Sequence, residues 1–421
     1  MSNPNVLGAI CWEAETAGAY NPAAGTGWAE PIDTWATDRV AILDSVDVSG
    51  LTNDPLEPGR VVQYRNDGTP YPEGPKGGTF TTKLYWTGHG STMVGSPTIN
   101  ARENYIARAF GVAAALSASA STTLTGGTAA VPTTTASGTF YAGGLCRVGA
   151  LGDGDGDGQF YAITTHTTTT LTLRGALRGA PVNGAVLYPV VQLYGPEAPT
   201  TSAITGTRFL LQTANLQYEC HGCFPMSISY SGFNAGEVPA AEITWGVSWW
   251  RYSTATFPST TSSAAATMNP GAVAAGSVNV QDVGTTTRNE RTLVRSISLE
   301  HTLGIEPLRG PGGINQYQAI IGARRLPDTI MFSVTEEADA ATTSPVLPLQ
   351  GLSSTMKHIE VTLSTADGSA FGFAMPNCCV TNIATQKQDG NLNRLTTMYR
   401  AHTSSVTTSN LTLAAIVYGM A

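Results

Sequence analysis

The stretch whose residue types and spacing best match a metal site is an acidic run, Asp153-Gly-Asp155-Gly-Asp157-Gly158. Oxygen ligands at the first, third and fifth positions followed by glycine at the sixth reproduce the first half of a calcium-binding loop. The twelfth position is Thr164 rather than a bidentate glutamate, and the flanking sequence predicts strands in place of helices. We therefore interpret the run as an acidic hairpin turn, with Asp153, Asp155 and Asp157 as calcium ligands in the alternative interpretation.

The cysteines offer a second kind of chemistry. Cys220-His221-Gly222-Cys223 has CxxC spacing, and a structural zinc ion would need two more ligands, for which the vicinal Cys378 and Cys379 are the available partners. A redox-active CxxC normally opens a helix, whereas this one leads into a strand. Six cysteines in 421 residues do not make a disulfide framework, so we predict ordinary buried thiols and no cofactor.

No catalytic arrangement stands out elsewhere in the chain. The six histidines show no HExxH spacing, and no serine lies in a nucleophile-elbow motif. We therefore predict that the protein is not an enzyme.

Composition excludes several classes of function. Only 12% of residues are charged, about half the usual share, and Gly, Ala, Ser and Thr replace them. Lysine and arginine (22) against aspartate and glutamate (30) give a net charge of −8, so there is no basic surface for gripping nucleic acid. No apolar run of 18 residues is present, and the first residues lack a basic secretory signal, so we expect no membrane partner and synthesis in a cytoplasm.

The elements that would position any site are mainly strands, and the clearest are the two arms of a hairpin within 216–252. In the first arm Met226, Ile228 and Tyr230 alternate with serines, and in the second Ile243, Trp245, Val247 and Trp249 are predicted to share one face. The glycine-containing segment 232–236 predicts the turn. One face of this hairpin is so apolar that its own chain or a neighbouring subunit must cover it.

One helix is predicted, at about 100–110, after a strand at 79–86. Asn100 is a suitable N-cap, and Tyr105, Ile106 and Phe110 lie in its apolar stripe. A single short helix in a chain of this length indicates the all-β class. A β-sandwich or barrel core with one flanking helix is the expected fold.

The chain divides into three parts. Residues 1–117 and 199–421 are predicted to form one β domain, interrupted at 118–198 by short strands and close-set turns typical of a small barrel-like module. Two further long arms, 379–388 and 391–402, flank Asp389-Gly390, a hairpin turn signal.

Taken in order, these elements resemble the tail tube protein (major tail protein) of tailed bacteriophages. The likeness is carried by the strand PKGGTFTTKLYWTGHGS, the helix INARENYIARAFG, the hairpin opening on YECHGCFPMSISYSG, the strand KHIEVTLSTADG with FGFAMPNCCVTN, and the terminal long hairpin. It covers about 1–115 and 205–421, and residues 118–198 depart from the minimal pattern. Similar tube proteins often carry added β domains on the outside.

The resemblance implies a structural virion protein located in the tail and assembled in the host cytoplasm. Such proteins form rings, usually of six subunits, whose long hairpins join into one β-barrel around the channel through which the DNA leaves. The implied partners are other copies of this chain, the tape measure protein, the tail tip or baseplate, the tail terminator, and passing DNA bound without sequence specificity.

On this interpretation one face of each hairpin packs against the rest of the protein or a neighbouring subunit, and the other face lines the bore. Ile243, Trp245, Val247 and Trp249 are expected to pack on the helix stripe formed by Tyr105, Ile106 and Phe110 and on the core, or against a neighbouring subunit. Lining of the bore is predicted for four acidic residues, Glu219, Glu237, Glu242 and Asp389. An acidic or neutral lumen would repel phosphates and let DNA slide.

Two other classes fit the same composition. One is a different virion component, such as a baseplate, decoration or fibre protein, which self-assembly behaviour would separate from a tube protein. The other is a surface glycan-binding β module, for which the Trp249-Trp250-Arg251-Tyr252 cluster could supply an aromatic platform.

Overall fold

The computed structural model describes most of the chain, and the statements below refer to the described residues. These are residues 8–14, 40–53, 76–85, 99, 101–110, 115–136, 140–149, 158–195, 206–213, 216–253, 256–258, 271–291, 293–308, 322–326, 328–337, 356–365, 370–389, 392–402 and 415–420.

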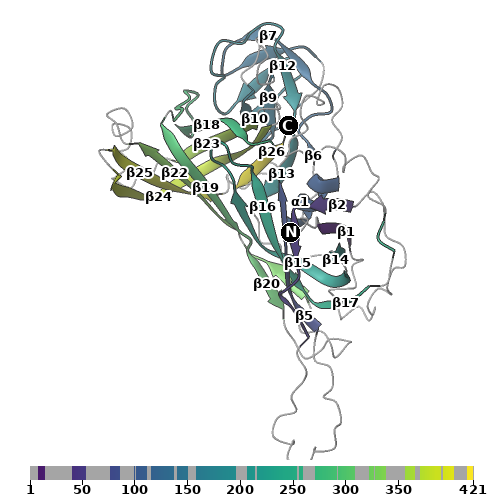
Figure 1. Cartoon of the computed structure of the whole chain (residues 1–421). Coiled ribbons are helices and arrows are strands. Elements are labelled where there is room, and N and C mark those ends of the chain that lie inside the picture. Colours follow the sequence, from purple (N-terminus) through teal and green to yellow (C-terminus); the bar gives the residue numbers. More distant parts are fainter. Residues whose placement is uncertain are drawn as a thin grey trace, which may run out of the picture.

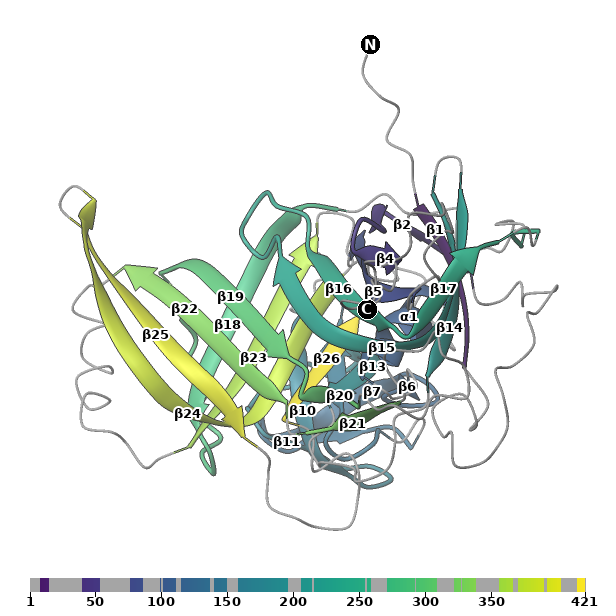
Figure 2. The ribbon, with the colours of Figure 1, turned by 90° about the horizontal axis from the view of Figure 1, so that it is seen from below.

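A large antiparallel sheet makes up most of the described chain, and one run of its strands carries the long hairpins (Figures 1 and 2). The strands of this run, in spatial order, are β3 (Ser45–Asp47) with β4 (Leu51–Asn53), β5 (Lys76–Tyr85), β16 (Ala240–Val247), β15 (Gln217–Ser231), β19 (Val294–Thr302), β22 (Thr329–Glu337), β25 (Leu392–His402) and β24 (Ala370–Asp389).

Two further groups of strands continue from the long strands β15 and β24. The first half of β15 pairs with β17 (Trp249–Tyr252) and with β14 (Thr207–Gln212), which leads to β1 (Gly8–Ala14) and β2 (Val40–Leu43). The first half of β24 pairs with β23 (Lys357–Thr365), next to β18 (Val273–Asp282), and with β26 (Ile416–Met420), next to β13 (Val191–Gly195) and β6 (Ala115–Leu116). Because β15 and β24 change partners along their lengths, the sheet folds over around a shared core.

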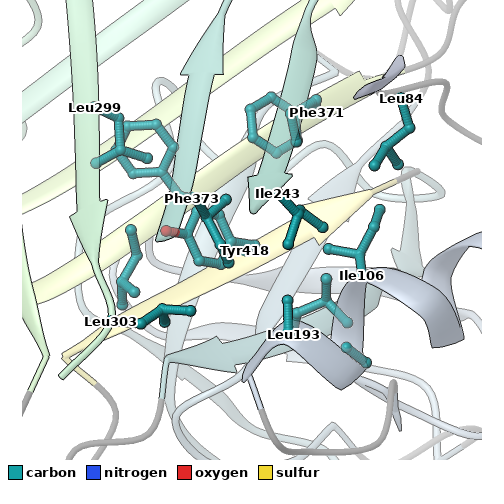
Figure 3. Close-up of a cluster of buried hydrophobic side chains, with 14 of the residues drawn as sticks. Leu84, Ile106, Leu193, Ile243, Leu299, Leu303, Phe371, Phe373 and Tyr418 are labelled. Carbon is teal, nitrogen blue, oxygen red and sulfur yellow. The ribbon is translucent and has the colours of Figure 1, made fainter. Parts of the chain in front are cut away.

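That core is apolar and continuous across all three groups of strands. The close-up in Figure 3 shows Ile243, Leu299, Phe373 and Tyr418 packed together although they come from four strands, β16, β19, β24 and β26. Beside them an aromatic cluster joins β1, β5, α1, β14 and β16, and its members are Trp12, Phe80, Tyr105, Phe209 and Trp245.

The helix α1 (Ala101–Phe110) lies against this core, as the sequence predicted. Tyr105 and Ile106 are fully buried. The Tyr105 hydroxyl lies 2.6 Å from Thr82 Oγ1 on β5 and accepts a hydrogen bond from Trp245 Nε1 at 2.8 Å. These contacts fix the helix against the β5–β16 pair. The predicted N-cap, Asn100, lies outside the described residues.

The β15–β16 hairpin is present, but two irregularities shift its predicted faces. A register shift between Pro225 and Ser227 leaves Met226 exposed, although the alternation of the sequence placed it with Ile228. A second irregularity lies where Gly222 adopts a positive φ of 59° opposite Ser248. Bulges of this kind reverse the alternation of side chains beyond them.

Next to this second irregularity, the tryptophan that enters the core is not the expected one. Trp249 was expected to share the face of Trp245, but Trp250 joins the core instead, at 8% exposure. Trp249 lies half-buried on the opposite face, with its ring 5.1 Å from that of His221. A strict period of two therefore does not extend past Val247.

A separate six-stranded sheet forms the module at the top of Figure 1. Its strands, in spatial order, are β11 (Leu171–Leu173), β10 (Phe160–His166), β9 (Leu145–Val148), β12 (Val186–Pro189), β7 (Thr122–Gly127) and β8 (Pro132–Thr134). It has a hydrophobic core of its own, which includes Tyr161, Ile163 and Leu187. The predicted insert of 118–198 is longer than this module, because β13 pairs with β26 in the large sheet.

One small ribbon completes the described strands, β20 (Ile305–Leu308) paired with β21 (Gly322–Arg325). The all-β class, with a sandwich-like or barrel-like core and one described helix, is confirmed. None of the described helical residues forms a segment long and apolar enough to cross a membrane.

Candidate assembly surface

A row of residues crosses eight neighbouring strands on the face of the large sheet that points away from the core. Each residue stands directly opposite the next, because the pairings of the strands are in register along this line. From β3 to β24 the row is Ser45, Lys83, Glu242, Ser229, Glu300, Met331, Arg400 and Cys379. All eight side chains are exposed or half-buried.

Hydroxyl groups dominate the neighbouring rows. Ser298 and Ser333 lie 2.7 Å apart between their hydroxyl oxygens, and Thr335 and Thr396 lie 2.9 Å apart. At the other end of the face Thr81 and Thr244 form a similar pair at 3.3 Å. These cross-strand hydroxyl pairs satisfy one another, so the face is polar without being strongly charged.

The described acidic and basic groups of this face are nearly equal in number. The cationic residues are Lys83, Arg295, Arg394 and Arg400, and the anionic residues are Asp47, Glu242, Glu300 and Glu337. Four positive and four negative side chains stand on the described strands of the face, and Asp44, just before β3, adds a carboxylate 3.7 Å from Lys83 Nζ. Arg295 and Glu337 form an ion pair with each other. The described part of the polar face therefore carries acidic and basic groups in nearly equal numbers.

The sheet bearing this face ends at the second half of β24. From Cys379 to Asp389 this strand pairs with β25 on one side, and no described strand pairs with its other side. Figure 2 shows the β24–β25 hairpin projecting at one end of the sheet. Unpaired N–H and C=O groups on a long strand form a template for another strand.

The sequence-predicted acidic residues occupy different places. Glu242 lies on the polar face and is exposed. Glu237 lies in the β15–β16 turn, where its carboxylate accepts hydrogen bonds from the backbone N–H and the side-chain amide of Asn234. Asp389 is the last residue of β24, paired in register with Leu392 at the hairpin end.

Glu219 lies in the interior. Its carboxylate is 1% exposed, lies 3.0 Å from His221 Nε2 and accepts a hydrogen bond from Arg251 Nε at 2.8 Å. Burial alone would raise the pKa of Glu219, but His221 and Arg251 outweigh burial and lower it. In the single chain this carboxylate links β15 to β17 through Arg251, and it does not lie on the polar face.

The predicted packing residues lie mostly in the core. Ile243, Trp245, Val247, Tyr105 and Ile106 are all fully buried within this chain. The side chain of Phe110 lies outside the described residues.

The sequence reasoning missed Lys83, Glu300 and Arg400 as parts of one row. Their strands are far apart in the chain, and only the register of β19 between β15 and β22 brings them together. The alternation of Ile297, Leu299 and His301 with polar residues was the available signal for β19.

No protein-family model matches this sequence, and no curated protein matches it. One solved structure with local similarity is titled "Cryo-EM structure of the anti-feeding prophage (AFP) baseplate, 6-fold symmetrised". The matched chain is 12% identical with a TM-score of 0.26, over 32% of this chain and 93% of that one. A similarity at this level carries no argument about function.

The two candidate metal sites have different outcomes. Asp153, Asp155 and Asp157 lie outside the described residues. Cys220 and Cys223 are free thiols buried in the main core. Within the described ranges no three His, Cys, Asp or Glu side chains are grouped as metal ligands would be.

Cys379 differs from the other five cysteines, which are buried. It is half-buried on the polar face, with its Sγ 2.9 Å from His402 Nε2. We expect Ellman's reagent to label one thiol per folded chain rapidly, and Cys379→Ser to remove that phase, because Cys379 is the one cysteine of the six that is not buried. The remaining thiols should react only after unfolding in urea. A fast phase that survives Cys379→Ser would contradict this assignment.

Proposed function

We propose that this protein is a structural component of a phage-like virion that works by self-assembly, and specifically that it forms the rings of a tail tube. The observation that carries the proposal is the continuous polar face across eight strands, which ends at an edge of β24 that no described strand pairs with. An edge of this kind can pair with a strand of another chain. When each copy joins the next through two different surfaces, and the rotation between copies closes, the copies form a ring.

The chemistry of the polar face fits the wall of a DNA channel. Its described acidic and basic groups are nearly equal in number and many of its remaining groups are hydroxyls, so a phosphate backbone would meet no net positive charge there. Glu242 and Glu300 add local negative charge in the central row. In this arrangement the polar face is lumenal and the apolar face is buried in each subunit's own core.

The partners follow from the role. Rings stack on identical rings, and the ends of the tube meet a tail tip or baseplate and a tail terminator. A tape measure protein and then the genome occupy the bore during assembly and ejection, without sequence-specific contacts.

Negative-stain electron microscopy of the purified chain, with multi-angle light scattering for the soluble mass, tests this proposal. We expect rings or hollow tubes of uniform bore. A monomer that stays monomeric at high concentration would contradict self-assembly of this chain and favour a decoration role. Rings with Glu242 and Glu300 outside the bore would reject the lumenal assignment while keeping the assembly.

A further inference from the structure

The six-stranded module packs against one face of the large sheet, mainly through β10 and β23. On β23, Ile359 and Val361 point into the main core, whereas Glu360 and Thr362 point the other way, toward β10 of the module. Figure 1 shows β10 lying over the region of β18 and β23. The contact has an apolar half and a polar half.

In the apolar half, the ring of Phe160 packs against two glycines of the large sheet. A Cβ added at Gly372 on β24 would lie 2.5 Å from Phe160 Cδ2, and one added at Gly419 on β26 would lie 3.3 Å from the same ring. The two glycines therefore provide space for the ring of Phe160. The residues that form the apolar contact are Leu145, Phe160, Ala162, Val190, Ala370, Ala374 and Val417.

The polar half is centred on Glu360, whose side chain is 2% exposed. Its Oε1 accepts a hydrogen bond from the Ala162 N–H at 2.9 Å and lies 3.0 Å from His358 Nε2. Its Oε2 accepts a hydrogen bond from Arg288 Nη1 at 2.8 Å, and the Arg288 guanidinium lies over the Tyr161 ring, 4.7 Å from its centroid. One carboxylate thus connects β23 to both a module strand and the 283–291 loop.

Other charged groups surround this hub on both sides. Arg288 Nε also donates to Glu290, which accepts a hydrogen bond from Arg178 of the module at 2.7 Å. Burial lowers the pKa of Arg174 in the module, and the negative charge of Glu360 partly offsets this effect. The neutral side chains of Asn279 and Gln281 fill the β18 side, and Lys357 and Asp282 pair at its margin.

We propose that the module is an acid-releasable arm: the charged Glu360 carboxylate holds it on the sheet, and loss of that charge frees the module while both sheets stay folded. The separate hydrophobic core of the module supports its persistence as a unit after release. Release of the module in this way would occur in a single chain as well as in a ring.

The direction of the pH dependence follows from the surroundings of Glu360. Burial alone would raise its pKa, but the hydrogen bond and charge of His358, the charge of Arg288 and the Ala162 N–H lower it below the ordinary value. A lowered pKa means that docking is favoured above the ordinary glutamate pKa and weakens as the pH falls through the value in the docked state.

The backbone amides of β10 report docking directly. Phe160 N–H donates to Thr362 Oγ1 and Ala162 N–H donates to Glu360 Oε1, both across the contact, whereas Ile163 N–H donates to Gly144 O inside the module. Residue-resolved hydrogen–deuterium exchange can therefore separate release of the module from its unfolding.

We expect Glu360→Gln at pH 7 to speed exchange at Phe160 and Ala162 by about tenfold or more, because it leaves the buried Arg288 without its main counter-charge. Ile163 should keep its protection. Glu290→Gln, which removes an outer carboxylate of the same network with 25% of its side chain exposed, is the matched control and should change exchange much less.

The wild-type chain supplies a second test that does not depend on a variant folding. When exchange is corrected for its intrinsic pH dependence, protection of Phe160 and Ala162 should be lost as the pH falls below about 4.3, the ordinary glutamate value, before Ile163 is exposed. All seven tryptophans lie outside the module, so their fluorescence should stay native there. Simultaneous loss of every signal, or a Glu290→Gln effect equal to that of Glu360→Gln, would overturn the proposal.

Discussion

Replacing Trp245 by alanine should lower the free energy of unfolding by about 3–5 kcal/mol, the usual cost of deleting a large buried aromatic side chain. Trp245 is fully buried on β16. Its ring stacks with Phe80 at 6.4 Å between centroids and meets Phe209 edge-on at 4.7 Å. The substitution would open a cavity where β5, β14, β16 and α1 meet, and the surrounding strands cannot close it without losing their pairings.

The hydrogen bond of the indole adds to this cost. Trp245 Nε1 donates to the hydroxyl of Tyr105, which is itself buried and lies 2.6 Å from Thr82 Oγ1. Burial raises the pKa of Tyr105, so its hydroxyl is protonated at neutral pH. Trp245→Phe keeps most of the ring packing but removes the N–H, and should therefore cost less than Trp245→Ala.

Urea unfolding followed by circular dichroism measures these differences. Tyr252→Ala is the matched control, because this aromatic residue of the same hairpin is 61% exposed and its removal should change stability by less than about 1 kcal/mol. If Trp245→Ala and Tyr252→Ala shifted the unfolding midpoint equally, the aromatic cluster would not hold the helix and the hairpin together.

Local patterns in the sequence were enough to predict the regular elements. The alternation within 226–231 predicted a strand, the Asn100 cap and apolar stripe predicted α1, and Asp389-Gly390 marked a hairpin turn. These signals depend only on residues close together in the sequence, so they can be read before the fold is known. The small module was visible for the same reason, since its turns are close together.

The departures came from features with a weak local signal. Gly222 gives no sign in the sequence that it adopts a positive φ, and in the same region Trp250 takes the place in the core that was expected for Trp249. Glu219 was expected to line a bore, but its carboxylate is buried, and its partner Arg251 is 32 residues away in the sequence. The polar row depends on the register of eight strands, which no single stretch encodes.

Blocking the open edge of β24 should abolish assembly without unfolding the chain. Successive N–H groups of a strand point to opposite edges, so of Asn382 and Ile383 one donates toward β25 and the other toward the unpaired edge. Asn382 pairs in register with Met398, and Ile383 with Thr397. Of Asn382→Pro and Ile383→Pro, one should therefore weaken the β24–β25 hairpin, and the other should leave the hairpin intact but remove a hydrogen bond donor from the edge.

The second of these variants is the informative one. We expect its urea midpoint to match that of the wild-type chain while rings and tubes disappear from negative-stain images. Ser298→Ala lies on the polar face but away from the edge, and it serves as the matched control. It removes one hydroxyl of the pair with Ser333 and leaves the backbone donors of the β24 edge in place, so this variant should assemble normally. Normal tubes from both proline variants would show that β24 is not the joining strand.

Mixing the edge-blocked chain with wild-type chain sharpens the test. In a heterologous ring each subunit offers two different faces, so a chain with one blocked face can still join through the other. It would then occupy a position and prevent the next subunit from binding. We therefore expect a minority of edge-blocked chains to suppress ring closure out of proportion to their number. Suppression that only follows dilution would instead indicate that the blocked chain is excluded from assembly altogether, and that both faces depend on β24.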